Sequence, residues 1–137
     1  MAKITSFVVC DSVTNFPASP EKSIPALVAP QIALRPQFVP GNFSFGIAVG
    51  ISDIDLHTEN KVRFAIVDPA GNTVHDAGET TLMQIPNRDT LPAQYQGFMM
   101  TMDIRNLVVE AEGEYRFVVY VNGECIGENI IPIYKRA

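Results

Sequence analysis

Large apolar residues recur at every second position in several parts of the chain, which is the period of a β-strand with one buried face. The alternation is clearest over 43–51, where Phe, Ile and Val residues alternate with Ser, Gly and Ala. It recurs over 62–66, 98–105 and 115–121. No window of about 12 residues carries apolar side chains at helical spacing. The pattern therefore predicts strands throughout and little helix.

Two short turns define where neighbouring strands reverse direction. Asn122-Gly123 is a strong hairpin signal, because a type I′ turn needs a positive φ at both central residues. We expect it to join strands over 114–121 and 124–134.

The second turn is Asp68-Pro69-Ala70-Gly71. Proline fixes φ at the second position, Asp68 can accept backbone N–H groups, and Gly71 suits a left-handed conformation. We expect this turn to join 61–67 to 72–76, after which a further strand follows over 79–85.

Residues 12–40 interrupt this regular pattern, since they hold six of the ten prolines. Proline has no N–H to donate to a strand ladder, so a central strand over the whole segment is excluded. We expect an extended crossover that contains one short edge strand over 28–34.

Together these elements predict one domain over 1–137, an all-β, antiparallel, immunoglobulin-like β-sandwich of about 7–9 strands. The immunoglobulin-like assignment depends on Tyr115, which precedes the core position Phe117 by two residues. Such a tyrosine begins strand F in these folds and hydrogen-bonds back to the preceding corner. The expected core residues are Phe45, Ile47, Val49, Phe64, Ile66, Met100, Met102, Phe117 and Val119.

Four stretches carry a family resemblance: VVCDS at 8–12, FSFGIAVGI at 43–51, VRFAIVDPAGN at 62–72 and GEYRFVVYVNGECIGENIIPIY at 113–134. With them the chain resembles a family of small, single-domain bacterial proteins of unknown function that have an immunoglobulin-like β-sandwich. The resemblance implies the fold. It implies no enzymatic activity and identifies no catalytic residue.

The charge composition excludes some classes of binding partner. The chain has a net charge of −5, from 10 basic and 15 acidic residues, and has no run of Lys and Arg. We therefore expect neither nucleic acid nor an anionic membrane surface as a partner. No apolar run reaches the roughly 18 residues of a membrane span, and the first ten residues lack the length and small-residue cleavage site of a signal peptide. A cytoplasmic protein is the expectation.

The two cysteines, Cys10 and Cys125, fall in expected strands among apolar neighbours. We expect both to be reduced and to behave as small hydrophobic residues, with neither binding metal. A disulfide between them would need adjacent first and last strands and an oxidising compartment.

Asp53, Asp55, His57 and Glu59 occupy every second position, so an extended strand would present them on one face. Asp53, Asp55 and His57 are the candidates for a metal-dependent hydrolase site. Consecutive members would lie roughly 6.5–7 Å apart, too far to share one ion easily. We prefer a solvated face and expect no cofactor.

The adjacent residues His75 and Asp76 are a second candidate for chemistry. Adjacent strand residues point their side chains in opposite directions, so a catalytic pair is disfavoured. We expect two polar residues at a strand end.

Ser44, Gly46, Ala48 and Gly50 give the strand over 43–51 a face of small residues only. Glycine weakens a strand interior, so another part of the chain or a ligand should approach this face closely. We expect the proline-rich crossover to cover it, with a partner or ligand as the alternative.

Val118, Tyr120 and Cys125 are the interface candidates. They lie opposite the core positions of the last hairpin, where Tyr120 should face Cys125 and form an apolar strip. Pro132 marks the last strand as an edge or a bulge. Such a strip beside an edge suits two-fold self-association, unless the crossover covers it within one chain.

The leading functional hypothesis is a non-enzymatic binding or assembly module, with a homodimer as one form. Three alternatives stay open. These are a small-molecule or sugar-binding sandwich that uses the loop 86–96 with Tyr95 and Phe98, a metal-dependent hydrolase centred on Asp53, Asp55 and His57, and an accessory structural protein of a phage or mobile element.

Overall fold

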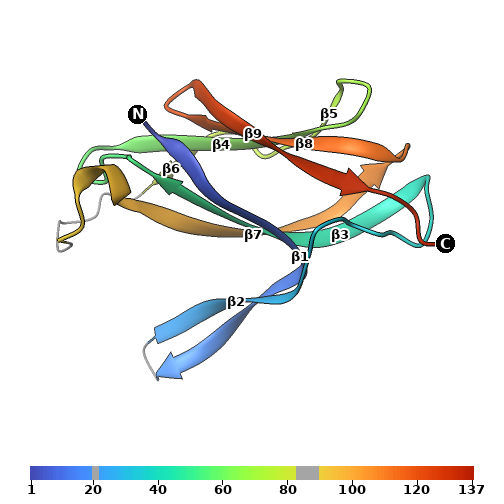
Figure 1. Cartoon of the computed structure of the whole chain (residues 1–137), viewed down its shortest axis with the longest axis horizontal. Helices are drawn as coiled ribbons and strands as arrows, with labels where there is room; N and C mark the ends of the chain where they lie inside the picture. The colour runs from blue at the N-terminus through green and yellow to red at the C-terminus, as the bar shows by residue number, and fades with distance from the viewer. Residues whose placement is uncertain (20–21, 83–89) are drawn as a thin grey trace.

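Two antiparallel sheets pack face to face in the computed structural model of the chain (Figure 1). The structure describes residues 1–19, 22–82 and 90–137. At residues 16, 18–19 and 22–23 it describes the backbone but not the side chains. The described residues form β1 (Lys3–Ser19), β2 (Lys22–Gln31), β3 (Gly41–Ser52), β4 (Asn60–Val67), β5 (Thr73–Asp76), β6 (Thr80–Leu82), the 3-10 turn η1 (Ala93–Tyr95), β7 (Gly97–Val109), β8 (Gly113–Val121) and β9 (Glu124–Ile133).

The strand order is β2-β1-β3-β7 in the first sheet and β5-β4-β8-β9 in the second, where β6 also pairs with β4. Each of the four segments with clear alternation lies inside a strand. The predicted antiparallel, immunoglobulin-like β-sandwich is therefore confirmed.

Both predicted turns are present. Asn122 and Gly123 have φ values of 52° and 82°, as a type I′ turn requires, and Val121 pairs with Glu124. In the other turn, the Asp68 carboxylate accepts the N–H groups of Ala70 and Asn72 at 3.0 and 2.8 Å. These bonds hold the chain reversal between β4 and β5.

The core lies between the two sheets and follows the predicted positions. Seven of the nine expected core side chains are buried, while Met100 and Met102 are half-buried. At the centre, the Phe117 ring lies between Phe64 and Phe7, with centroid distances of 5.5 and 5.3 Å.

Tyr115 forms the predicted tyrosine corner. Its ring is buried, and its hydroxyl donates to the carbonyl oxygen of Ala111 at 2.8 Å. Burial raises the pKa of Tyr115 above its ordinary value. The bond ties the start of β8 to the turn before it, as the motif does in immunoglobulin-like folds.

The expectation for residues 12–40 is wrong. Most of this segment forms a long hairpin, because β1 continues to Ser19 and pairs with β2 from Val9↔Gln31 to Ser19↔Lys22. β2 is an edge strand, where a proline whose N–H would face outward costs no ladder bond. The edge strand therefore spans 22–31 rather than 28–34.

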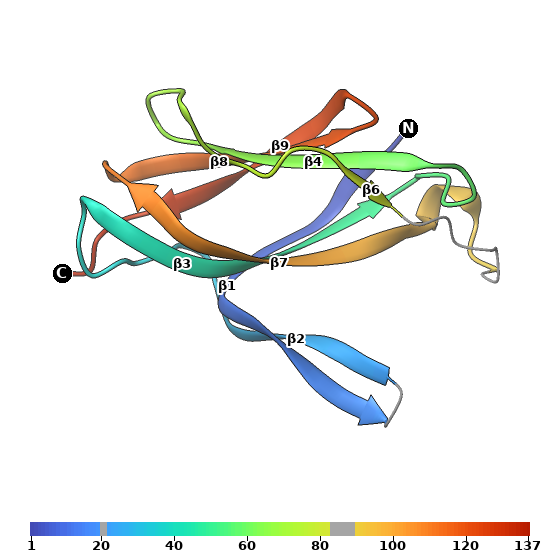
Figure 2. The ribbon, with the colours of Figure 1, turned by 180° about the vertical axis from the view of Figure 1, so that it is seen from behind.

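Beyond Cys10, β1 no longer pairs with β3 and continues with β2 alone. We call residues 12–28 the hairpin arm. The arm stands clear of the sandwich in views from the front and from behind (Figures 1 and 2).

After the arm, the chain returns to the far end of the second sheet. Leu34 donates its N–H to the carbonyl oxygen of Pro132 at 2.8 Å, and Tyr134 donates to that of Leu34 at 3.1 Å. β9 is the outer strand of its sheet, so the edge position predicted from Pro132 is confirmed. This short parallel contact covers the end of that edge.

Candidate binding surfaces

The small-residue face of β3 is covered by its own neighbours. A Cβ atom at Gly46 would lie 2.8 Å from Cys10 Sγ and 2.9 Å from Val13 Cγ2, and one at Gly50 would lie 2.7 Å from Met99 Sδ. The two flanking strands therefore explain the glycines. The expected cover by the 12–40 segment holds at Gly46, which Ser12 and Val13 approach at the base of the arm.

On the same outer face, a shallow hollow of about 250 Å³ opens beside Gly50. Tyr95 and Met99 border it with side chains that are 59% and 62% exposed. The Ser52 hydroxyl, also in its lining, is buried and has no hydrogen-bond partner among the described residues. The hollow thus joins an exposed apolar rim to one unpaired polar group.

The aromatic site expected around 86–96 is only partly present in this region. Tyr95 is exposed at the hollow, whereas Phe98 is half-buried and packs against the core. Residues 86–89 lie outside the described part of the chain.

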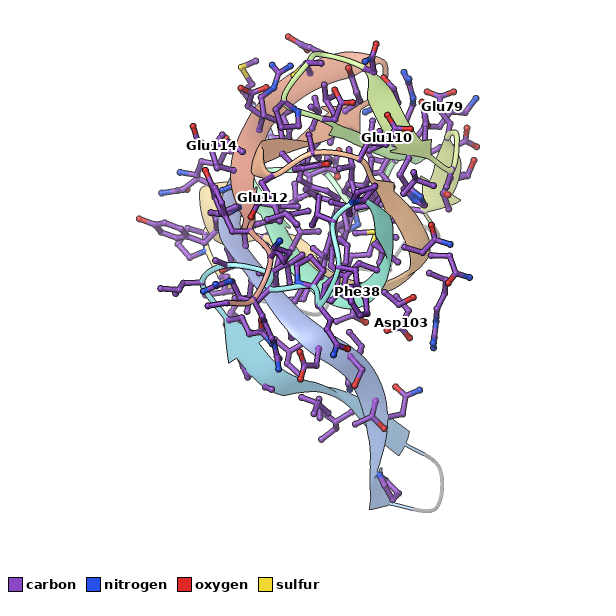
Figure 3. All side chains as sticks on the ribbon, turned by 90° about the vertical axis from the view of Figure 1, so that its right-hand side faces the viewer. Phe38, Glu79, Asp103, Glu110, Glu112 and Glu114 are labelled. Atoms are coloured by element: carbon purple, nitrogen blue, oxygen red, sulfur yellow. The ribbon has the colours of Figure 1, made fainter. Side chains whose placement is uncertain are left out.

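The hairpin arm leaves the sandwich from this same outer face. The Val13 N–H donates to the Asp103 carboxylate of β7 at 3.3 Å. Asp103 is labelled in the side view, where the arm extends away from the body (Figure 3). On the arm, Ile24 and Val28 are 47% and 44% exposed. The arm therefore presents apolar side chains to solvent.

The strip expected at Val118, Tyr120 and Cys125 is not an exposed apolar surface. Tyr120 does face Cys125 in the register, which confirms the pairing. Val118, however, is only 7% exposed, and the Arg63 guanidinium lies 4.8 Å from the centre of the Tyr120 ring. The strip lies on the outer face of the second sheet, where polar side chains are its neighbours. The Arg63 guanidinium makes a cation–π contact with the Tyr120 ring and so places a charged group over it.

The carboxylates at 53–59 do not share one face. The segment is a loop with a turn rather than an extended strand, so the alignment on one strand face is wrong. The preferred solvated position is confirmed for Asp55, His57 and Glu59, which are exposed. Asp53 has a φ of 60° and pairs with the N-terminal ammonium group at 2.7 Å. The Asp55 carboxylate accepts the His57 N–H at 2.9 Å and so stabilises the local turn. No group of three potential metal ligands occurs among the described residues.

His75 and Asp76 point apart, as their adjacency predicts. The Asp76 carboxylate accepts hydrogen bonds from Arg63 Nε, at 3.2 and 3.0 Å to its two oxygens, from Arg63 Nη2 at 2.5 Å, and from the Gly78 N–H at 2.9 Å. These bonds, chiefly those from Arg63, lower the pKa of Asp76. His75 instead lines a cavity between the sheets.

The two cysteines differ in exposure. Cys10 is fully buried, as expected of a small hydrophobic residue in a strand, whereas Cys125 is exposed on the face opposite the core. Both are free. Burial raises the pKa of Cys10, and the nearby Asp103 and Asp11 carboxylates raise it further.

We therefore expect the native protein to take up one iodoacetamide group quickly, at Cys125, and a second much more slowly, at Cys10. Thiolates are the reactive species, and Cys10 is both buried and harder to ionise. Intact-mass spectrometry over time, with a denatured sample as the two-adduct control, measures this. Equal labelling rates, or a denatured mass that shows an internal disulfide, would contradict it.

No helix among the described residues has the length and apolar character that crossing a bilayer requires.

Comparison with known proteins gives a family and several similar solved structures. No curated protein matches the chain. Among solved structures, the chain is similar to an immunoglobulin-like protein from Pseudomonas aeruginosa, with 16% identity over 97% of this chain and 96% of that one and a TM-score of 0.37. Residues 5–134 match a family of unknown function, in agreement with the resemblance drawn from the sequence. The chain belongs to the family of unknown function DUF6941.

Proposed function

We propose that this protein is a non-enzymatic assembly module that associates with a second copy of itself through the hairpin arm. The observation that carries the proposal is the arm itself, an apolar two-stranded extension outside the sandwich. Between residues 12 and 31 the only charged residues are Glu21 and Lys22.

None of the arm side chains that the structure describes is fully buried. A two-stranded hairpin without a packed face is marginally stable in water. Exposed apolar side chains grouped on one element also mark interaction surfaces. Ile24 and Val28 supply such a surface, and burying each in a partner would stabilise both the arm and the assembly.

A second copy of the chain is the favoured partner, because the arm and the hollow lie on the same outer face of the first sheet. The arm leaves from the outer face that also carries the hollow beside Tyr95 and Met99. Two-fold association uses the same patch on both subunits, so a protruding element and a receiving hollow on one face meet its requirement.

The arm is tested by comparing two charge substitutions on opposite sides of the molecule. We expect sedimentation analysis to find a dimer for the unmodified protein and at least a tenfold weaker dimer for Val28→Glu, because a carboxylate would be buried at the contact. Tyr120→Glu, on the outer face of the second sheet, is the matched control and should leave the dimer unchanged. Circular dichroism and thermal unfolding verify that both variants are folded.

The opposite pattern, with Tyr120→Glu weakening the dimer and Val28→Glu leaving it intact, would return the interface to the strip of Val118, Tyr120 and Cys125. A monomer at high-micromolar concentration would remove self-association altogether.

The other functional hypotheses have less support. A metal-dependent hydrolase site would need Asp53, Asp55 and His57 to converge, and instead two of them serve local contacts. A sugar site would retain Tyr95 as its single exposed aromatic residue in the described part of that loop. An accessory structural role in a phage or mobile element would use the same arm. Two free cysteines fit the proposed cytoplasmic location.

A further inference from the structure

A cavity of about 180 Å³ lies between the two sheets, on the side where β7 faces β5 and β6. Its inner wall consists of Phe64 and Phe117 from the second sheet and Ile104 from β7. Its contents would therefore contact aromatic rings and alkyl groups. A dry apolar cavity of roughly 150 Å³ is large enough to bind benzene in a protein.

Met100 and Met102 form the β7 side of the cavity, together with Ile104. Both point toward the core, because they pair in register with the buried residues Val49 and Ile47. They are nevertheless only half-buried. Nothing in the described chain completes their cover on the open side, and methionine side chains adapt readily to an apolar occupant.

The lining of the cavity restricts the chemical class of a ligand. His75 and Thr80 border it and offer hydrogen-bonding groups. An anionic ligand is disfavoured because it would lose its hydration among the apolar lining groups, and no Lys or Arg side chain among the described residues belongs to the lining to compensate its charge.

We propose that this cavity is a binding site for a small, neutral, apolar molecule of roughly the size of a benzene ring, with a hydroxyl group directed toward His75 and Thr80. The site lies between the sheets, whereas the hairpin arm lies outside them. The proposal therefore stands independently of self-association.

The methionine methyl groups provide a direct test. We expect a titration with benzyl alcohol, followed by nuclear magnetic resonance of ¹³C-methyl-methionine protein, to give saturable shifts at Met100 and Met102. Met99 is the internal control, because it is adjacent in sequence but lies on the outer face over Gly50. Met1, at the exposed N-terminus, is a second control.

Two matched variants and a second probe sharpen the result. Met102→Phe places a rigid, slightly larger side chain in the cavity wall and should reduce the affinity reported by the shift at Met100 at least severalfold, whereas Met99→Phe adds the same ring outside and should leave that affinity unchanged. Benzoate, which differs by its charge, should bind at least tenfold more weakly than benzyl alcohol.

The titration of the unmodified protein decides the matter even if Met102→Phe does not fold. Absence of saturable shifts at Met100 and Met102 with millimolar benzyl alcohol, or equal shifts at Met99, would overturn the site. Benzoate binding as tightly as benzyl alcohol would overturn the preference for a neutral ligand.

Discussion

Replacement of Phe117 by alanine should lower the free energy of unfolding by about 3–5 kcal/mol, the usual cost of removing a buried phenylalanine. Phe117 is fully buried at the centre of the sandwich, between Phe64 of the adjacent strand and Phe7 of the opposite sheet. Its removal would leave an unfilled space that also joins the neighbouring cavity, since Phe117 lines that cavity. Urea denaturation, followed by circular dichroism, measures the change.

Val108→Ala is the control for this experiment. Val108 is a half-exposed residue of β7, so the substitution removes methyl groups without opening the core. We expect a change of under about 1 kcal/mol. A denaturation midpoint of Phe117→Ala close to that of the unmodified protein would contradict the assignment of this residue to the core.

The second large effect is expected at Gly97, the first residue of β7. A Cβ atom there would lie 1.9 Å from the carbonyl oxygen of Ile51 and 2.7 Å from the Cα of Ser52. Both are backbone atoms of β3, so the contact can be relieved only by separating the paired strands. We expect Gly97→Ala to cost about 3 kcal/mol or more, at or above the upper end for overpacking.

Gly50→Ala is the matched comparison, because its shortest contact would be with Met99 Sδ at 2.7 Å. A flexible side chain can move away, so the cost should be closer to about 1 kcal/mol. Thermal and chemical unfolding of the two variants measure the difference. Equal costs would show that β7 can shift at its start.

The parts of the fold that follow from local sequence were predictable. The turn at Asn122-Gly123 and the corner at Tyr115 depend on conformations and hydrogen bonds formed within a few residues. The alternation over 43–51 also identified a buried strand, because a strand between two neighbours in a sandwich must present one apolar face to the core.

The sequence did not reveal the hairpin arm, because its prolines argue against a central strand. Only the strand order shows that β2 lies at the edge of the sheet. Once β2 is an edge strand, the missing N–H groups are tolerated there. The loop 53–59 was misassigned for the opposite reason. Alternating polar residues resemble a strand face, but the Asp55 carboxylate and the His57 N–H close a turn that depends on local capping rather than on periodicity.

The candidate surfaces could be predicted only in part. Small residues on β3 indicated a close approach, and the structure shows that Cys10, Val13 and Met99 supply it. The cavity beside Met100 and Met102 depends on how the edges of two different sheets face each other. The hydrophobic pattern of a single segment cannot predict how two sheets are placed relative to each other.

The most direct test of the proposed assembly is hydrogen–deuterium exchange of the arm at two protein concentrations. We predict that peptides from residues 12–28 exchange markedly more slowly at high-micromolar than at low-micromolar concentration, while peptides from β8 exchange equally at both. Burial of the arm in a second copy would protect amides that a marginally stable hairpin otherwise exposes. Identical exchange of the arm at both concentrations would contradict the account.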